Sequence, residues 1–309
     1  MRNSNLTFVV QGPVYSEGDG TAEVLASIRS WYPGAYLVLS TFASTPVELF
    51  AHLDADEVVL SEDPGDMTPK GFKALNINRQ IVTTRAGLAR VATPYVVKTR
   101  TDLVVTGRQL LDSYAPHVER GPVLVTNITT RDPDLAVRIP YWISDFLYMG
   151  RTEDLRFVFN APLYGPSDFT HASAPSDRSH YCPDVVSIFP PEVYLGLRLL
   201  RRFRPEIRQP ADLREAEQMS RKDFWDFLVD HLLVVGPEGA GLRSIKYPLP
   251  FPNHAVMVKP GKWQTMHALR GSSIEGPGRA LLQGATRFAY LIRRAAEKLS
   301  DTVRGIRRT

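Results

Sequence analysis

The chain has 309 residues, of which 43% are hydrophobic and 23% charged, a composition typical of an ordinary soluble globular protein. Its one cysteine, Cys182, excludes a disulfide within the chain and favours a reducing compartment. The N-terminal stretch is too polar for a signal peptide, and no run approaches the ~18 apolar residues of a membrane-spanning helix, so we expect a cytoplasmic protein.

Positive charge is concentrated at the C-terminal end of the sequence. The whole chain carries a formal charge of +4, whereas residues 275–309 hold eight Lys or Arg residues against three Asp or Glu residues, an excess of five. Residues 1–274 therefore sum to −1. Such a nearly neutral body argues against a nucleic-acid-binding surface there.

The first half of the chain alternates between strand-like and helix-like segments. Apolar, β-rich runs predict strands at residues 6–14, 35–42, 56–65 and 93–105. Helical spacing and stop signals predict helices at residues 20–33 and 75–92. Continuous apolar strands separated by helices predict a parallel sheet that is covered on both faces.

Polar turns follow three of these predicted strands. They are QGPV (11–14), SEDPG (61–65) and RTD (100–102). Because ligands of parallel sheets bind outside the carboxyl ends of the strands, these turns are the candidate ligand-binding loops.

The second half of the chain is less regular. It holds predicted strands at residues 121–129 and 143–150 and predicted helices at residues 190–203 and 220–235. Residues 160–190 are rich in Pro, Ser, His and Asp, which predicts a long functional loop. The predicted organisation is one domain over residues 1–274 and a helical tail over residues 275–309.

The strand at 93–105 carries three charges among its apolar residues, namely Lys98, Arg100 and Asp102. A buried carboxylate without a partner is costly, so Asp102 needs one. One interpretation is an ion pair with Arg100 or Lys98 at the strand end. The other is that Asp102 holds a divalent cation on a nucleotide diphosphate while Arg100 binds phosphate, because hard cations prefer carboxylate oxygens.

Four blocks of sequence, taken in order, resemble the WavE-type lipopolysaccharide-synthesis family. They are FVVQGPV (8–14), NINRQIVTTRAGL (76–88), KTRTDL (98–103) and ISDFLYMG (143–150). The likeness is close over roughly the first half of the chain. It implies a glycosyltransferase with an α/β, GT-A-like fold, in which helices cover a mostly parallel Rossmann-type sheet.

The same resemblance implies a role for the Arg-Thr-Asp turn. In GT-A enzymes an Asp-X-Asp turn at the end of a central strand binds the metal and the sugar nucleotide. Asp102 would then bind Mn²⁺ or Mg²⁺, with His254 or His267 completing the shell. Arg100 stands in the place of the first aspartate, which puts metal dependence in doubt and makes Arg100 an alternative cation for the phosphates.

Residues from four segments are predicted to bind the donor. They are Gln11, Gly12, Pro13, Asn78, Arg79, Arg100, Asp102, Lys259 and Lys262. Gly12 would let the backbone approach the base or ribose, and Arg79 would reach phosphate. The two lysines would clamp the diphosphate, with Trp263 covering the sugar or base. A plain turn explains Gly12 equally well, and a solvated helix face explains Arg79 about as well.

Two carboxylates are candidates for the catalytic base, since glycosyl transfer with inversion needs a group that takes the proton of the acceptor hydroxyl. The first choice is Asp145, which lies among apolar residues and is flanked by Trp142, Phe146 and Tyr148 as stacking surfaces for sugar rings. The second is Glu192, whose place at the start of a helix also has a structural explanation.

The tail carries an apolar stripe at helical spacing, formed by Leu281, Ala285, Phe288, Ile292, Ala295, Leu299, Val303 and Ile306. With arginines opposite, this predicts a basic amphipathic helix on the anionic inner face of the cytoplasmic membrane. A helix docked on its own domain, or on a second subunit, is the alternative.

The predicted function is transfer of a sugar from a nucleotide-sugar donor to a glycolipid or polysaccharide acceptor in cell-surface glycan synthesis. A sugar nucleotidyltransferase and a non-catalytic membrane-docked scaffold are the alternatives. The first alternative is disfavoured because residues 9–20 lack the basic residues of the Gly-rich loop that such enzymes carry.

Overall fold

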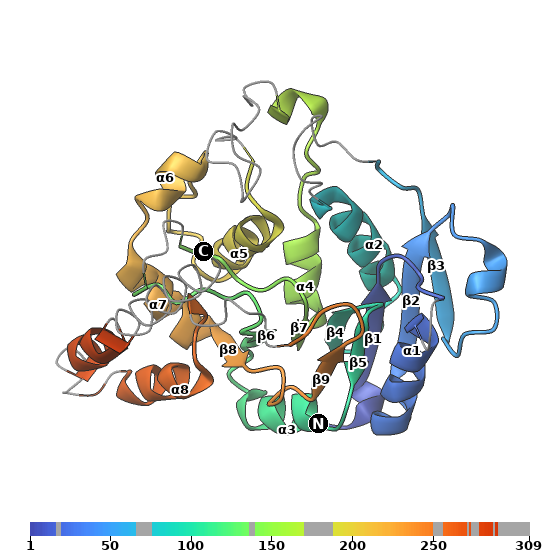
Figure 1. Cartoon of the computed structure of the whole chain (residues 1–309), viewed down its shortest axis with the longest axis horizontal. Helices are drawn as coiled ribbons and strands as arrows, with labels where there is room; N and C mark the ends of the chain where they lie inside the picture. Colours follow the sequence, from blue (N-terminus) through green and yellow to red (C-terminus); the bar gives the residue numbers. More distant parts are fainter. Residues whose placement is uncertain are drawn as a thin grey trace, which may run out of the picture.

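A seven-stranded sheet forms the centre of the protein (Figure 1). The computed structural model describes residues 1–16, 20–65, 76–135, 140–169, 188–249, 256–270, 272, 278–286 and 288–289. The strands, in their order across the sheet, are β3 (Glu57–Ser61), β2 (Tyr36–Phe42), β1 (Leu6–Gln11), β4 (Tyr95–Arg100), β7 (Tyr148–Arg151), β6 (Val123–Thr126) and β8 (Leu232–Val235).

All of these strands run parallel except β7, which is antiparallel to both β4 and β6. β1 and β4, at the centre, consist of almost entirely buried residues, as expected for a sheet that is covered on both faces. The α/β class with a mostly parallel sheet is confirmed. Because β7 is reversed, the residues that precede it lie at the same edge as the carboxyl ends of its parallel neighbours.

Up to residue 270, the described part of the chain contains eight α-helices that flank the sheet. They are α1 (Gly20–Trp31), α2 (Ile77–Ala89), α3 (Gln109–Tyr114), α4 (Thr152–Phe159), α5 (Pro191–Phe203), α6 (Leu213–Glu217), α7 (Arg221–His231) and α8 (Pro260–Leu269). Short 3-10 helices occur at Asn3–Asn5, Val47–Leu49, Ala115–His117 and Pro166–Phe169. Helix α2 packs on β1, β2 and β3, and α7 and α8 pack together beside β8.

One glycine explains how closely α2 approaches the sheet. A Cβ atom at Gly87 would lie 2.5 Å from Cγ1 of Val9 on β1 and 3.2 Å from Cβ of Ser40 on β2. Only a residue without a side chain fits at that distance. This contact fixes α2, and with it Gln80, against the strands that carry the candidate site.

The predicted strand over 93–105 is in fact two strands, and that prediction was wrong in its extent. β4 ends at Arg100, and β5 (Leu103–Val105) leaves the main sheet to pair with β9 (Leu242–Ser244). At the break, the backbone N–H of Thr101 donates to the carbonyl of Gln11 on β1, and the carbonyl of Asp102 accepts from the N–H of Ile245 after β9. The turn at 101–102 is therefore tied to both sheets.

Two other predicted elements differ from the structure. The predicted helix over 220–235 ends at His231, and Leu232–Val235 form the edge strand β8. A short apolar run of this kind satisfies either structure, and pairing with β6 decides it. The predicted strand over 143–150 begins only at Tyr148, so Asp145 lies in irregular chain.

The beginning of the tail is docked on the domain. Residues 278–286 are helical, and Nη1 of Arg279 lies 2.7 Å from Oδ1 of Asp226 on α7. Leu282 packs against the core, whereas Leu281 and Phe288 are 76% and 67% exposed. The rest of the predicted amphipathic helix, like most of the predicted loop over 160–190, lies outside the described residues. Among the helices that the structure does describe, none combines the length and the apolar character needed to cross a bilayer.

Candidate active site

The Arg-Thr-Asp turn at the end of β4 contains a bidentate ion pair between Arg100 and Asp102. Nε of Arg100 lies 2.8 Å from Oδ1 of Asp102, and Nη2 lies 2.7 Å from Oδ2. The carboxylate of Asp102 is only 2% exposed, whereas the Arg100 side chain is 22% exposed. Burial alone would lower the pKa of Arg100, but the bonds to Asp102 hold this pKa above its usual value, so the guanidinium stays charged. Of the two interpretations of Asp102, the ion pair with Arg100 is present.

The turn after β1 is joined to the Arg-Thr-Asp turn. Oγ1 of Thr101 donates a 2.7 Å hydrogen bond to the carbonyl of Pro13. Gly12 has a φ of 127°, and a Cβ atom there would lie 3.0 Å from Oγ1 of Thr101, so glycine is required for this close approach. Gln11 points inward, where its Oε1 accepts a hydrogen bond from Thr83 of α2. The two turns thus form one rigid edge of the sheet.

Asp145 lies at this same edge, three residues before β7. It is mostly buried, and it is held from two elements. Nε2 of Gln80 donates to the carbonyl and to Oδ2 of Asp145, at 3.2 and 3.1 Å. Nζ of Lys98 donates to the same carbonyl. The carboxylate of Asp145 also helps to raise the pKa of Arg100.

Lys98 lies fully buried beneath Asp145, and its Nζ is 5.8 Å from the centre of the Tyr148 ring and 5.7 Å from that of Phe159. Burial lowers the pKa of Lys98 to about 7, although the charge of Asp145 opposes the shift. Lys98 is therefore only partly charged near neutral pH, and its contact with the Asp145 backbone makes it a positioning group.

Glu192 reaches the same neighbourhood from the first turn of α5. Its carbonyl accepts from the N–H of Ile143, which ties α5 to the segment that carries Asp145. Both Asp145 and Glu192 add to the effect of burial in raising the pKa of Tyr148 well above its usual value. A backbone hydrogen bond thus joins the two segments that carry the carboxylates nominated as bases.

A cluster of which the sequence nominates only Arg100 and Phe146 completes this edge. We call it the aromatic–cation cluster, and it consists of Tyr15, Arg100, Phe146, Lys246 and Tyr247. Cζ of Arg100 lies 4.5 Å from the Phe146 ring centre and 5.9 Å from that of Tyr247. Nζ of Lys246 lies 5.4 Å from the Tyr247 ring and 5.7 Å from the Tyr15 ring. Two cations and three aromatic rings from four chain segments therefore meet at the end of β4.

The β5–β9 pair explains how Lys246 and Tyr247 arrive there. Ile245 follows β9 directly, and its N–H donates to the carbonyl of Asp102 at 3.0 Å. Tyr247 packs on a small separate core formed by Leu103, Ile128 and Phe146. In the sequence, Lys246 and Tyr247 are marked only as a lysine beside a tyrosine in a proline-rich stretch. That pattern does not show that they lie beside Arg100.

The two predicted helix residues differ in their placement. Asn78 is buried, and its side-chain amide exchanges two hydrogen bonds with the backbone of Tyr164, so it holds a loop in place. Arg79 is partly exposed and pairs with Asp63 beyond β3, with Nε 2.8 Å from Oδ1. This pairing lowers the pKa of Asp63. Arg79 remains at the sheet edge, whereas Asn78 has a structural role.

Lys262, which the sequence nominates as a diphosphate clamp, is paired with two buried carboxylates in the structure. Its side chain is 5% exposed, and Nζ lies 2.9 Å from Oδ2 of Asp132 and 2.8 Å from Oδ2 of Asp134. We call these three residues the buried triad. They lie with Trp225 near β8, because α8 packs there.

Three other predicted residues of this segment, Trp263, His267 and Lys259, belong to the described part of the chain, and His254 does not. Trp263 is buried and donates to the carbonyl of Leu228, and His267 stacks on it, so each contacts other parts of the domain. Lys259 is exposed at the start of α8. His254 lies outside the described residues, and its role as a metal ligand stays a prediction.

The donor set at the end of β4 does not fit a divalent cation. Both oxygens of Asp102 accept from Arg100, which also places a positive charge beside them. In the part of the chain that the structure describes, no group of three His, Cys, Asp or Glu side chains could hold an ion. Hard cations need several oxygen ligands, and this turn has one committed carboxylate.

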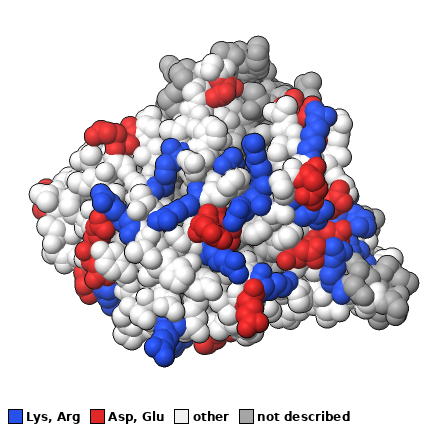
Figure 2. All heavy atoms as spheres, turned by 180° about the vertical axis from the view of Figure 1, so that it is seen from behind, with Lys and Arg blue, Asp and Glu red and all other residues white. Residues whose placement is uncertain are grey.

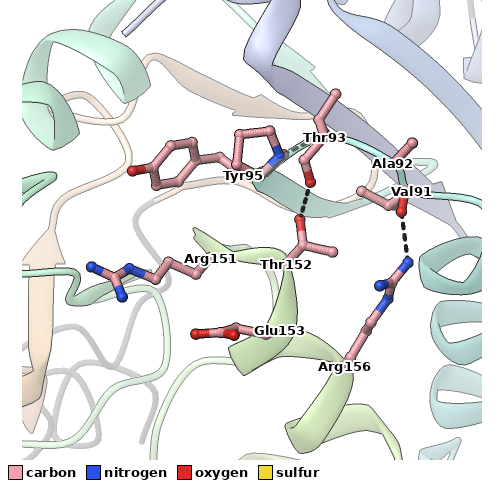
Figure 3. A pocket seen from close by; sticks show the side chains of 9 residues that line it. Val91, Ala92, Thr93, Tyr95, Arg151, Thr152, Glu153 and Arg156 are labelled. Carbon is pink, nitrogen blue, oxygen red and sulfur yellow. Dashed lines mark hydrogen bonds between the residues drawn. The ribbon is translucent and has the colours of Figure 1, made fainter.

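A surface cavity of about 360 Å³ lies where β4 begins, at the end of this strand opposite to Arg100 (Figure 3). It is bordered by Thr93 and Tyr95, where β4 begins, and by Arg151, Thr152 and Arg156, where β7 ends and α4 follows. Because ligands of such sheets bind at the carboxyl ends of the strands, we place the candidate site at Arg100 and not in this cavity.

Lys and Arg side chains also gather across the middle of the face seen from behind, with a few acidic groups among them (Figure 2). Several arginines of α2, α4 and α5 bind helix-end carbonyls, as Arg156 does with those of Leu88 and Val91. The net charge of residues 1–274 does not reveal that Lys and Arg side chains cluster on this face.

Comparison with known proteins identifies one matching family. A family model described as WavE lipopolysaccharide synthesis matches residues 6–274. No protein with a curated description matches the chain by sequence.

Three solved structures that match the chain overlap with it only weakly. Glucosyl-3-phosphoglycerate synthase from Mycobacterium tuberculosis, in complex with Mn²⁺, UDP-glucose and phosphoglyceric acid, is 13% identical, with a TM-score of 0.40 over 90% of this chain and 79% of that one. TarS 1–349 from S. aureus is 18% identical, with a TM-score of 0.32 over 50% and 48%. 4-Diphosphocytidyl-2C-methyl-D-erythritol synthase from Anaerococcus prevotii is 9% identical, with a TM-score of 0.33 over 53% and 81%. None of these overlaps is close enough to assign a function.

Proposed function

The chain belongs to the WavE lipopolysaccharide synthesis family, and from this membership we propose that it is a glycosyltransferase that moves a sugar from a nucleotide donor to a glycolipid or polysaccharide acceptor. The observation that carries the proposal is the sheet edge at the end of β4. There a charged turn, a mostly buried carboxylate and the aromatic–cation cluster lie together.

Each group at this edge has a role in the proposed reaction. Arg100 and Lys246 bind the diphosphate, and Tyr15 and Tyr247 offer faces on which a base can stack. The Asp145 carboxylate takes the proton of the acceptor hydroxyl, which then attacks the anomeric carbon. The bond to the diphosphate breaks, and the cations stabilise the charge that develops on it. Attack from the opposite face would invert the anomeric centre.

A thermal-shift panel tests this function. We expect one class among UDP, GDP, CMP, dTDP and their sugars to raise the unfolding temperature, since a ligand that binds only the folded state stabilises it by mass action. CTP and UTP with sugar phosphates serve as the comparison, because a nucleotidyltransferase would respond to these instead. A chain that responds to none of these compounds contradicts the proposal.

We also propose that the C-terminal helix binds an anionic membrane surface. Leu281 and Phe288 leave an apolar face open to solvent, while Arg279 and Leu282 anchor the start of the helix on the domain. Beyond Thr286 the sequence adds seven Lys or Arg residues against two Asp or Glu residues. A basic segment that follows exposed apolar residues in the sequence suits binding to an anionic lipid surface, where an acceptor glycolipid would lie.

We expect a chain that ends at Thr286 to fold and bind its donor but to lose attachment to anionic vesicles. Each basic residue near such a surface contributes about 1 kcal/mol, and salt screens this attraction but not apolar burial. Full-length protein should therefore float with anionic vesicles, bind neutral ones weakly, and lose part of its binding at high salt.

Vesicle flotation distinguishes the helix from an ordinary exposed apolar residue. In the full chain, Phe288→Ser should weaken flotation, whereas Val47→Ser, a change at another exposed apolar residue, should not. If the shortened chain floats as well as the full chain, the tail is structural and the membrane proposal fails.

A further inference from the structure

We infer that this chain binds the diphosphate of its donor without a divalent cation, with Arg100 and Lys246 in the cation's place. The inference rests on the proposed function and specifies how the site would recognise a nucleoside diphosphate. The Arg-Thr-Asp turn does not fit a divalent metal ion.

The first step is the charge of the turn. An Asp-X-Asp turn carries two negative charges, and a bound dication brings the sum to zero. The Arg-Thr-Asp turn already sums to zero, because the guanidinium of Arg100 neutralises Asp102 through two hydrogen bonds. A dication added here would face a fixed guanidinium, which keeps its proton at all ordinary pH values.

The second step is the donor capacity of Arg100. A guanidinium has five N–H groups, and only two of them are needed for Asp102. The side chain is about one-fifth exposed, and its Cζ lies 4.5 Å from the Phe146 ring centre and 5.9 Å from the Tyr247 ring centre, so both rings restrict its movement. The remaining N–H groups can therefore donate to phosphate oxygens in a fixed orientation. Asp102 acts as the positioning residue for this fork.

The third step is the second cation. Burial acts to lower the pKa of Lys246, but the hydroxyls of Tyr15 and Tyr247 outweigh it and raise this pKa, so the ammonium is charged at neutral pH. Lys246 and Arg100 flank the same Tyr247 ring. The bond from Ile245 to Asp102 fixes the segment that carries Lys246 to the turn that carries Arg100. The two cations thus belong to one unit.

Calorimetric titration of UDP-, GDP-, CMP- and dTDP-sugars into the full chain tests the inference. We expect the donor to bind in EDTA with an affinity within about threefold of that measured in MnCl₂ or MgCl₂. Binding that EDTA abolishes and Mn²⁺ or Mg²⁺ restores would overturn the inference and leave the proposed function intact. Absence of binding in every buffer would overturn both.

Lys246→Met provides the matched variant, since Lys246 is exposed and its loss leaves no buried charge. We expect the donor affinity in EDTA to fall at least roughly tenfold, the scale of one charged hydrogen bond. Lys222→Met, which removes an exposed lysine on α7, should leave the affinity unchanged. An unchanged affinity in Lys246→Met would remove Lys246 from the diphosphate site and overturn the inference as stated.

Discussion

Asp145→Asn is expected to lower the rate of sugar transfer at least roughly a hundredfold, the usual scale for the loss of a general base. The amide cannot take the proton of the acceptor hydroxyl. The fold should survive, because Lys98 and Gln80 both bind the backbone carbonyl of residue 145, which the change leaves in place. Donor affinity should stay near normal, since the proposed diphosphate contacts come from Arg100 and Lys246.

Single-turnover rates with a saturating donor provide the measurement. Asp112→Asn, a change at an exposed carboxylate on α3, serves as the control and should transfer sugar normally. Near-normal transfer by Asp145→Asn would move the catalytic role to Glu192, and Glu192→Gln would then show the large loss instead.

Lys262→Met is expected to lower the free energy of unfolding by about 3–5 kcal/mol, the cost of breaking a buried ion pair by removing one partner. The change leaves Asp132 and Asp134 buried side by side without their common cation. Denaturant unfolding measures the loss. Lys259→Met, a change at an exposed lysine three residues earlier, should stay within about 0.5 kcal/mol of the unchanged chain.

The loss of unfolding free energy in Lys262→Met should also depend on pH, and it should become smaller as the pH falls. Burial raises the pKa of Asp132, and Lys262 opposes this shift, so the pKa rises further when Lys262 is removed. A carboxyl with a raised pKa in the folded state binds a proton more readily there than in the unfolded state. The variant should therefore regain stability as the pH falls below neutral. A loss that does not change with pH would contradict the account of the buried triad.

The sequence predicts the central part of the sheet and its charged edge well, because both depend on local patterns. β1, β2 and β4 appear as apolar runs, and the three charges at 98, 100 and 102 mark the strand end without help from distant residues. The antiparallel direction of β7 and the assignment of 232–235 to a strand depend on pairing, which a local pattern does not contain.

The candidate site is predictable only where its residues lie near a recognised motif. Lys246 and Tyr247 reach Asp102 through two three-residue strands far apart in the chain, so nothing in their own segment marks them. Lys262 looks like an exposed lysine in sequence, because its carboxylate partners lie 130 and 128 residues earlier. Long-range contacts decide both cases.

The most direct test of donor binding at the end of β4 is the nucleotide-sugar panel applied to the full chain and to Arg100→Gln/Asp102→Asn. The double change removes one positive and one negative charge, so the net charge of the chain is unchanged. Two neutral amides replace the ion pair, so neither change leaves an unpaired buried charge and the fold should persist, although glutamine is two heavy atoms smaller than arginine. We predict that the donor that binds the unchanged chain binds the double variant at least roughly tenfold more weakly. Equal affinity for the two chains would contradict the account, because the donor would then bind elsewhere.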